Sequence, residues 1–105
     1  MRNYNRTSIF NLAWQFIKKN GMTLSEALKV AWANAKVKNA LHRGITHFRF
    51  FKVDGSIREA YGTLDPHWAP EPLGLRTPAP SVQTYWDTEK SAWRCFKRVN
   101  LIGLA

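Results

Sequence analysis

The chain has 105 residues, of which 45% are hydrophobic and 22% are charged. This length supports one compact domain and is too short for two well-packed ones, and the composition excludes a disordered chain. Sixteen Lys and Arg residues against seven Asp and Glu residues give a formal charge of +9, so the expected partners are polyanions, anionic membranes or acidic protein surfaces.

The first predicted element is a helix near the N-terminus. Thr7 or Ser8 is expected to cap it, and the helix is expected to run to about Asn20. Gly21 then ends it, because glycine readily adopts the left-handed conformation that closes a helix.

A second helix is predicted directly afterwards. The residues from Thr23 to Glu26 have the spacing of a capping box, and apolar residues then recur at steps of three and four. This helix is expected to reach about Leu41 or His42 and to end before Gly44. Residues 1–44 therefore predict a helical hairpin.

From residue 45 onward, β-branched and aromatic residues predict strands over 45–53 and 56–64, joined by a tight turn at Asp54-Gly55. A two-residue loop fixes the cross-strand pairs, which are Lys52 with Ile57, Phe50 with Glu59, Phe48 with Tyr61, and Phe51 with Arg58. Neither face of this hairpin is then purely apolar.

Residues 65–80 contain all five prolines and predict one long connection without regular structure. Trp68, Leu73 and Leu75 are expected to hold this loop against the protein. Strands over 81–87 and 91–98 follow, and the last residues are a candidate for a final edge strand. The predicted fold class is α+β, a single domain 1–105 with a basic helical hairpin (1–44) before a small antiparallel SH3-like or Sm-like barrel (45–105).

No constellation of residues predicts catalysis or metal binding. The three histidines are scattered, and Cys95, the only cysteine, is expected to be a buried strand residue. We therefore expect no enzyme activity, no cofactor and no small-molecule substrate. No apolar run approaches the ~20 residues that span a bilayer, and the basic N-terminal segment lacks the features of a signal peptide, so we expect a cytoplasmic protein.

Two surfaces are candidates for binding nucleic acid. Residues 1–44 hold eight basic residues and one acidic residue, and the helical cations are expected to converge on one patch that neutralises phosphates. These are Lys18, Lys19, Lys29, Lys36, Lys38 and Arg43. A solvated helix face is the alternative for each of them.

The second candidate surface combines rings and cations on the strands. Single-stranded nucleic acid is bound by aromatic side chains that stack on bases and by cations that contact the backbone. The residues expected to do so are Arg49, Lys52, Arg58, Trp86, Arg94, Lys97 and Arg98. The alternative is that most of the rings fill the core of the barrel.

Three stretches of the sequence also carry a family resemblance: "LSEALKVAWANAK", "FRFFKVDGSIREAYGTLDP" and "VQTYWDTEKSAWRCFKRVNLI". Over about residues 22–102 the chain resembles small proteins with an Sm-like, SH3-type β-barrel, found mainly in phages and mobile elements. The resemblance implies a five-stranded barrel, an origin in a mobile element and no enzyme activity. A cysteine stands in "WRCFK" where a small polar residue is more usual.

These observations together predict a non-catalytic accessory protein that binds RNA or an RNA-containing host complex. A host-defence inhibitor that occupies the guide-RNA channel of a CRISPR effector is one such protein. The alternative is an SH3-like adaptor or a transcription-associated structural protein that docks another protein. A third reading, in which the first helix lies on a membrane, ranks last because Phe16 and Ile17 are needed for packing.

Overall fold

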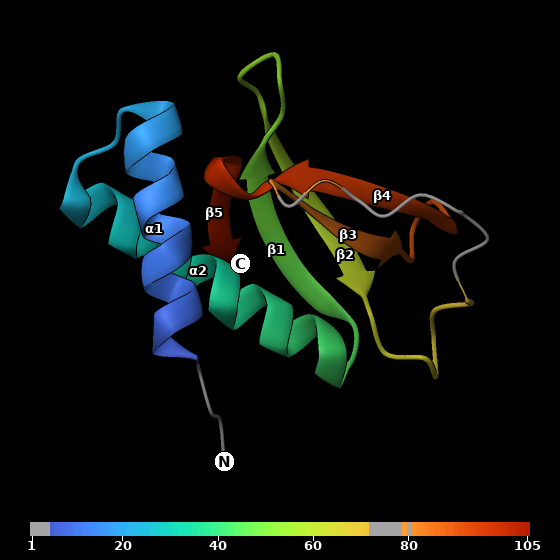
Figure 1. Cartoon of the computed structure of the whole chain (residues 1–105). Coiled ribbons are helices and arrows are strands. Elements are labelled where there is room, and N and C mark those ends of the chain that lie inside the picture. The colour runs from blue at the N-terminus through green and yellow to red at the C-terminus, as the bar shows by residue number, and fades with distance from the viewer. Residues whose placement is uncertain (1–4, 72–78, 80) are drawn as a thin grey trace.

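The computed structural model describes residues 5–71, 79 and 81–105. Two helices precede five strands, which confirms the predicted fold class (Figure 1). The elements are α1 (Arg6–Asn20), α2 (Leu24–Arg43), β1 (Thr46–Phe51), β2 (Ile57–Thr63), β3 (Val82–Asp87), β4 (Ala92–Lys97), a 3₁₀ turn (Arg98–Asn100) and β5 (Leu101–Leu104). The last residues do form an edge strand, which pairs with β1.

Helix α1 begins earlier than predicted. Asn5, and not Thr7 or Ser8, is the N-cap, because its side-chain oxygen accepts a hydrogen bond of 3.1 Å from the backbone N–H of Ser8. This bond satisfies one of the N–H groups that a helix leaves without a partner at its start. Gly21 ends the helix in the left-handed conformation, as predicted, with φ of 67°.

The capping box of α2 is present as predicted. The backbone N–H of Glu26 donates to the hydroxyl of Thr23 over 3.2 Å, and the Glu26 carboxylate accepts from the N–H of Thr23 over 3.4 Å. Reciprocal bonds of this kind fix the first turn of a helix. The helix then continues to Arg43, and Gly44 follows it.

The five strands form one antiparallel sheet in the order β4-β3-β2-β1-β5, with β4 and β5 at its edges. The hairpin of β1 and β2 projects beyond the helices and the other strands (Figure 1). Strands β2 and β3 pair only through Gly62 with Asp87 and Thr63 with Trp86. Because so little of β2 is paired with β3, the rest of the two strands is free to diverge.

The predicted pairing of this hairpin is wrong by one residue. The N–H of Lys52 donates to the carbonyl of Ser56, and the loop between them holds three residues and not two. Gly55 has φ of 89° at the last loop position, as the three-residue hairpin requires. A shift of one residue exchanges the faces of a strand, so Phe48 lies opposite Ala60. The inward face of β2 therefore carries Arg58, Ala60 and Gly62 in place of Ile57, Glu59 and Tyr61.

The core has two parts. In the first, α2 contributes Val37 and Leu41, which pack on the inward side chains of the sheet: Phe48, Phe50, Ala60, Tyr85, Phe96 and Leu101. In the second, α1 packs on α2 through Ile9, Ala13 and Phe16 against Ala27 and Ala31. Helix α2 therefore lies between α1 and the sheet, so it links the helical hairpin to the strands.

Two expectations about burial are wrong. Trp68 is 57% exposed and does not hold the connection after β2, where Ala69 is buried in its place. Leu73 and Leu75 lie outside the described residues. Cys95 is exposed, because β4 is an edge strand and its face with Trp93, Cys95 and Lys97 points away from the core.

Gly62 provides the first testable prediction. It is buried, and a Cβ atom there would meet the ring of Tyr85 and lie 3.2 Å from the carbonyl oxygen of Trp86. Overpacking of this kind typically costs about 1–3 kcal/mol. We expect Gly62→Ala to lower the free energy of unfolding by that amount in urea denaturation. Gly44→Ala is the control, because a Cβ atom there meets nothing within 4 Å; equal losses in both variants would contradict the prediction.

The turn of the β1–β2 hairpin provides the second testable prediction. Asp54 accepts hydrogen bonds from the hydroxyl of Ser56 over 2.6 Å and from its N–H over 2.9 Å, and these bonds lower the pKa of Asp54. A lowered pKa favours the folded turn above the usual pKa of the carboxyl, and this contribution disappears as the pH falls through the folded value. In Ser56→Ala, an NMR titration of Asp54 should give a higher pKa, and an unchanged pKa would show that the hydroxyl has no such effect.

Candidate nucleic-acid interface

A groove of about 760 Å³ lies between the β1–β2 hairpin and β4. We call it the basic groove, because four cationic side chains line it and Asp54 is the single acidic residue among the described residues of its lining. The cations are Lys52, Arg58, Arg94 and Lys97, all predicted as binding residues. The remaining lining is Phe50, Phe51, Val53, Val82, Tyr85, Cys95, Phe96 and Asn100.

Two of these cations share a buried carboxylate. The Asp87 side chain is completely buried, and its Oδ2 accepts from Nη2 of Arg58 over 2.7 Å, while Nε of Arg94 lies 3.7 Å away. The other oxygen, Oδ1, accepts from the backbone N–H groups of Glu89 and Lys90. One aspartate therefore joins β2 to β3 and β4 and also closes the β3–β4 turn.

The groove retains positive charge that its own carboxylates do not neutralise. Asp87 faces two guanidinium groups, and the side chain of Arg94 is 43% exposed. Lys52 and Lys97 are exposed at the rim, and among the described residues neither has a carboxylate within 4.0 Å. These three cations are therefore accessible to an anion.

The apolar part of the groove contains aromatic rings. Phe50 is buried and stacks on Phe96, with ring centroids 5.3 Å apart, so it forms the floor. Phe51 lies on the opposite face of β1 and is exposed. Burial raises the pKa of Tyr85 further above its usual value, at which the phenol is already neutral at physiological pH. Phe51 is thus the exposed ring among the described residues that line the groove.

The shared aspartate provides the third testable prediction. Removing one partner of a buried ion pair leaves the other charge uncompensated, which typically costs about 3–5 kcal/mol. We expect this loss of unfolding free energy in Asp87→Ala, measured by urea denaturation. The control is Glu59→Ala, which removes an exposed pair with Arg49 (2.9 Å) and should cost about 1 kcal/mol or less. Similar losses in the two variants would show that Asp87 has no special role.

Two of the predicted strand residues lie outside the groove. Arg49 is on the outward face of β1 and pairs with Glu59, beside a stack of His47 on Tyr61 with centroids 4.3 Å apart. Trp86 is on the outward face of β3, where its ring meets that of Trp93 edge to face at 5.6 Å. The structure therefore does not bring Arg49 or Trp86 together with the cations of the groove.

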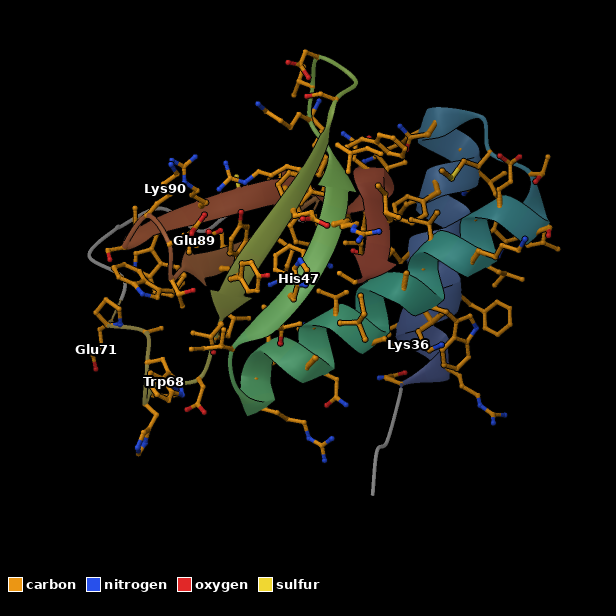
Figure 2. All side chains as sticks on the ribbon, turned by 180° about the vertical axis from the view of Figure 1, so that it is seen from behind. Lys36, His47, Trp68, Glu71, Glu89 and Lys90 are labelled. Carbon is orange, nitrogen blue, oxygen red and sulfur yellow. The ribbon has the colours of Figure 1, made fainter. Side chains whose placement is uncertain are left out.

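The helical cations do not form one patch. Lys29 and Lys36 line one hollow beside β5, and Lys36 and Arg43 line another. The three are spaced seven residues apart, or about two helical turns, so they follow one side of α2. Lys38 lies on another side of α2, and Figure 2 shows Lys36 on α2, well away from Lys90 at the β3–β4 turn.

The remaining predicted residues lie elsewhere. Lys18 and Lys19 are exposed in the last turn of α1, where cations complement the negative end of the helix dipole. Arg98 is half-buried in the 3₁₀ turn, where its Nε donates to the carbonyl of Val82 over 3.2 Å. It lines a second pocket together with Lys38. Arg98 therefore faces a different space from Lys97, its neighbour in the sequence.

Comparison with protein families identifies the fold. The model of a family described as "WYL_2, Sm-like SH3 beta-barrel fold" matches residues 34–102, which is well over half of the chain. The chain belongs to this family. The match confirms the Sm-like, SH3-type barrel that the sequence resemblance implied. A comparison with curated proteins and one with solved structures each found no significant match.

The structure gives physical roles to the residues that carry the resemblance. In "DGSIREAYGT", Gly55 closes the hairpin, Arg58 binds Asp87 and Gly62 makes room for Tyr85. In "YWDTEKSAWR", Asp87 is the shared carboxylate and Arg94 is its second partner. These residues build the barrel and at the same time place two arginines in the basic groove.

The described residues contain no group of three or more His, Cys, Asp or Glu side chains that could hold a metal ion. None of the helices in the described part of the chain is long and apolar enough to cross a membrane. Phe16 is buried and Ile17 half-buried, as the packing argument expected, whereas Phe10 and Trp14 of α1 are exposed.

Proposed function

We propose that the protein binds single-stranded RNA, alone or within an RNA-containing complex, through the basic groove. The observation that supports this proposal is the arrangement of accessible cations around an apolar groove with an exposed ring. Lys52 and Lys97 supply point charges for phosphates, and Arg94 adds a guanidinium that contacts phosphate oxygens. Phe51 supplies a face on which a base can stack.

The groove favours a single strand over a duplex. Its cations lie around a recess rather than on a flat or convex surface, and bases can enter such a recess only when they are unpaired. Stacking on an aromatic ring is tolerant of sequence, since every base has a π-face. We therefore expect modest sequence preference and a strong dependence of affinity on salt.

The fourth testable prediction is a salt titration of RNA binding. For single strands, the slope of log K against log salt changes by about 0.7 for each phosphate contact. We expect Lys52→Gln/Lys97→Gln to reduce the slope by about twice that amount and to weaken binding of a short oligouridylate. The matched control is Lys18→Gln/Lys19→Gln, which removes the same charge from the end of α1. Equal effects of the two double variants would assign the affinity to net charge and overturn the groove as the site.

Two further readouts locate the bound strand. Phe51→Ala should weaken binding by about 1–3 kcal/mol if a base stacks on the ring. Cys95 is exposed in the groove and is the only cysteine of the chain, so bound RNA should slow alkylation of its thiol. Unchanged affinity in Phe51→Ala would show that no base stacks on this ring.

The resemblance to phage and mobile-element proteins extends the proposal to a host complex. A small basic protein with an RNA-binding groove would act by occupying the place of a guide RNA, for example in a CRISPR effector, in the cytoplasm of the host. Affinity purification from a lysate that contains such an effector, with and without nuclease, tests this extension. If the effector is recovered and its recovery falls at high salt, the extension is supported. Failure to recover the effector would contradict the extension.

A protein-docking function is the second candidate. It is favoured by the tip of the β1–β2 hairpin, where Val53 is 86% exposed and Ile57 is also exposed. An SH3-like adaptor would use this apolar tip and the groove to bind another protein. A partner that remains bound after nuclease treatment and at high salt, and that is lost in Val53→Ser, would favour the adaptor over RNA binding.

A further inference from the structure

A second pocket of about 340 Å³ lies between α1, α2 and the start of β3. It adjoins the basic groove through the chain itself, since Val82 and Lys97 line the groove while Gln83 and Arg98 line the pocket. Its size is at the lower end of the range of about 300–1,000 Å³ that is usual for small-molecule sites. The pocket therefore suits one compact ligand better than a length of chain.

The charges of the pocket have one sign. Lys38 and Arg98 carry them, and none of the described lining residues is acidic. Arg98 is half-buried, and among the described residues it has no carboxylate partner. A cation removed from water is normally paired with an anion. The described part of the protein therefore supplies no counter-ion for Arg98 in this pocket.

Arg98 is also held in place. Its Nε donates to the carbonyl of Val82 over 3.2 Å, and its Nη2 lies 3.5 Å from the side-chain oxygen of Gln83. These contacts involve two of its three nitrogens and orient the guanidinium plane. Burial lowers the pKa of Arg98, because water stabilises the charge less here than at the surface.

Amide groups give the pocket a hydrogen-bonding wall. Asn34 is only 8% exposed, and its Nδ2 donates to the carbonyls of Val30 (2.8 Å) and Arg98 (2.9 Å). These two bonds fix the amide of Asn34 in one orientation at the wall of the pocket.

The remaining lining completes a site with two halves. Ile9, Leu12, Ala31 and Ala35 form an apolar wall from α1 and α2. A planar ring fits against such a wall, and fixed amides recognise the edges of a nucleobase. Asn5 and Ser8 add polar groups at the N-terminus of α1, where the helix dipole favours an anion.

We propose that this pocket binds a nucleoside 5′-monophosphate unit, with its phosphate at Lys38 and Arg98 and its base against the apolar wall near Asn34. The unit has two sources, a free mononucleotide or the 5′-phosphorylated end of an RNA strand. The second source rests on the proposed function, because the rest of the strand would continue into the basic groove.

The test uses the full chain and two kinds of probe. AMP and UMP report on a free nucleotide by calorimetry, and oligouridylates with a 5′-phosphate or a 5′-hydroxyl report on a strand end. Lys38→Gln should weaken binding of the relevant probe about tenfold, the loss expected for one hydrogen bond to a charged group. Lys36→Gln is the matched control, since it lies two residues away, about 200° around α2, and outside the pocket.

A second variant separates nucleotide recognition from simple anion binding. Ala35→Leu places a larger side chain in the apolar wall and so narrows the pocket. This variant should bind AMP and UMP more weakly and should bind inorganic phosphate as the unchanged protein does. Circular dichroism and thermal unfolding verify that Lys38→Gln and Ala35→Leu fold. Lys52→Gln/Lys97→Gln should leave mononucleotide binding unchanged, so the pocket and the groove can fail separately.

Each outcome has a defined meaning. Binding of AMP or UMP that falls in Lys38→Gln supports a free nucleotide. Preference for the 5′-phosphorylated strand that disappears in Lys38→Gln supports a strand end. Equal behaviour of Lys38→Gln and Lys36→Gln, or inorganic phosphate that binds as tightly as AMP, would overturn the proposal, as would the absence of binding by every probe.

Discussion

The buried carboxylate of Asp87 is the interaction on which the barrel and its groove depend. Strands β2 and β3 share only two backbone pairs, so a side-chain bridge from Arg58 to Asp87 spans the region where they are not paired. The same carboxylate closes the β3–β4 turn through two N–H groups and faces Arg94 on β4. One acidic side chain therefore allows two arginines to lie beside an apolar groove without a buried charge left unpaired.

The helical part of the fold was predictable because its signals are local. The capping box at Thr23 and the stop at Gly21 depend on residues within one turn of each other, and both are present. The hairpin register was not predictable in this way, because Asp54-Gly55 fits loops of two and of three residues. That difference of one residue moves Ala60 to the position opposite Phe48 and decides which face of the strand enters the core.

In the candidate sites, too, the residue types were predictable from the sequence, whereas their positions depend on contacts between distant segments. The sequence indicated cations on the strands, but the pairing of Arg49 with Glu59 and the position of Trp86 on the outward face depend on the register. The exposure of Cys95 follows from β4 being an edge strand, which no local pattern shows. The amides of the second pocket lie far apart in the sequence, and no spacing in the sequence predicts that they meet.

Two short segments of the chain separate the basic groove from the second pocket. Val82 and Gln83 on β3, like Lys97 and Arg98 after β4, are bonded neighbours that face different spaces, and Nε of Arg98 binds the carbonyl of Val82. A ligand that displaces this guanidinium would break its hydrogen bond to Val82, a residue of the groove wall. If the loss of that bond alters the groove, thermodynamic linkage requires that an occupant of either space change the affinity of the other by the same factor.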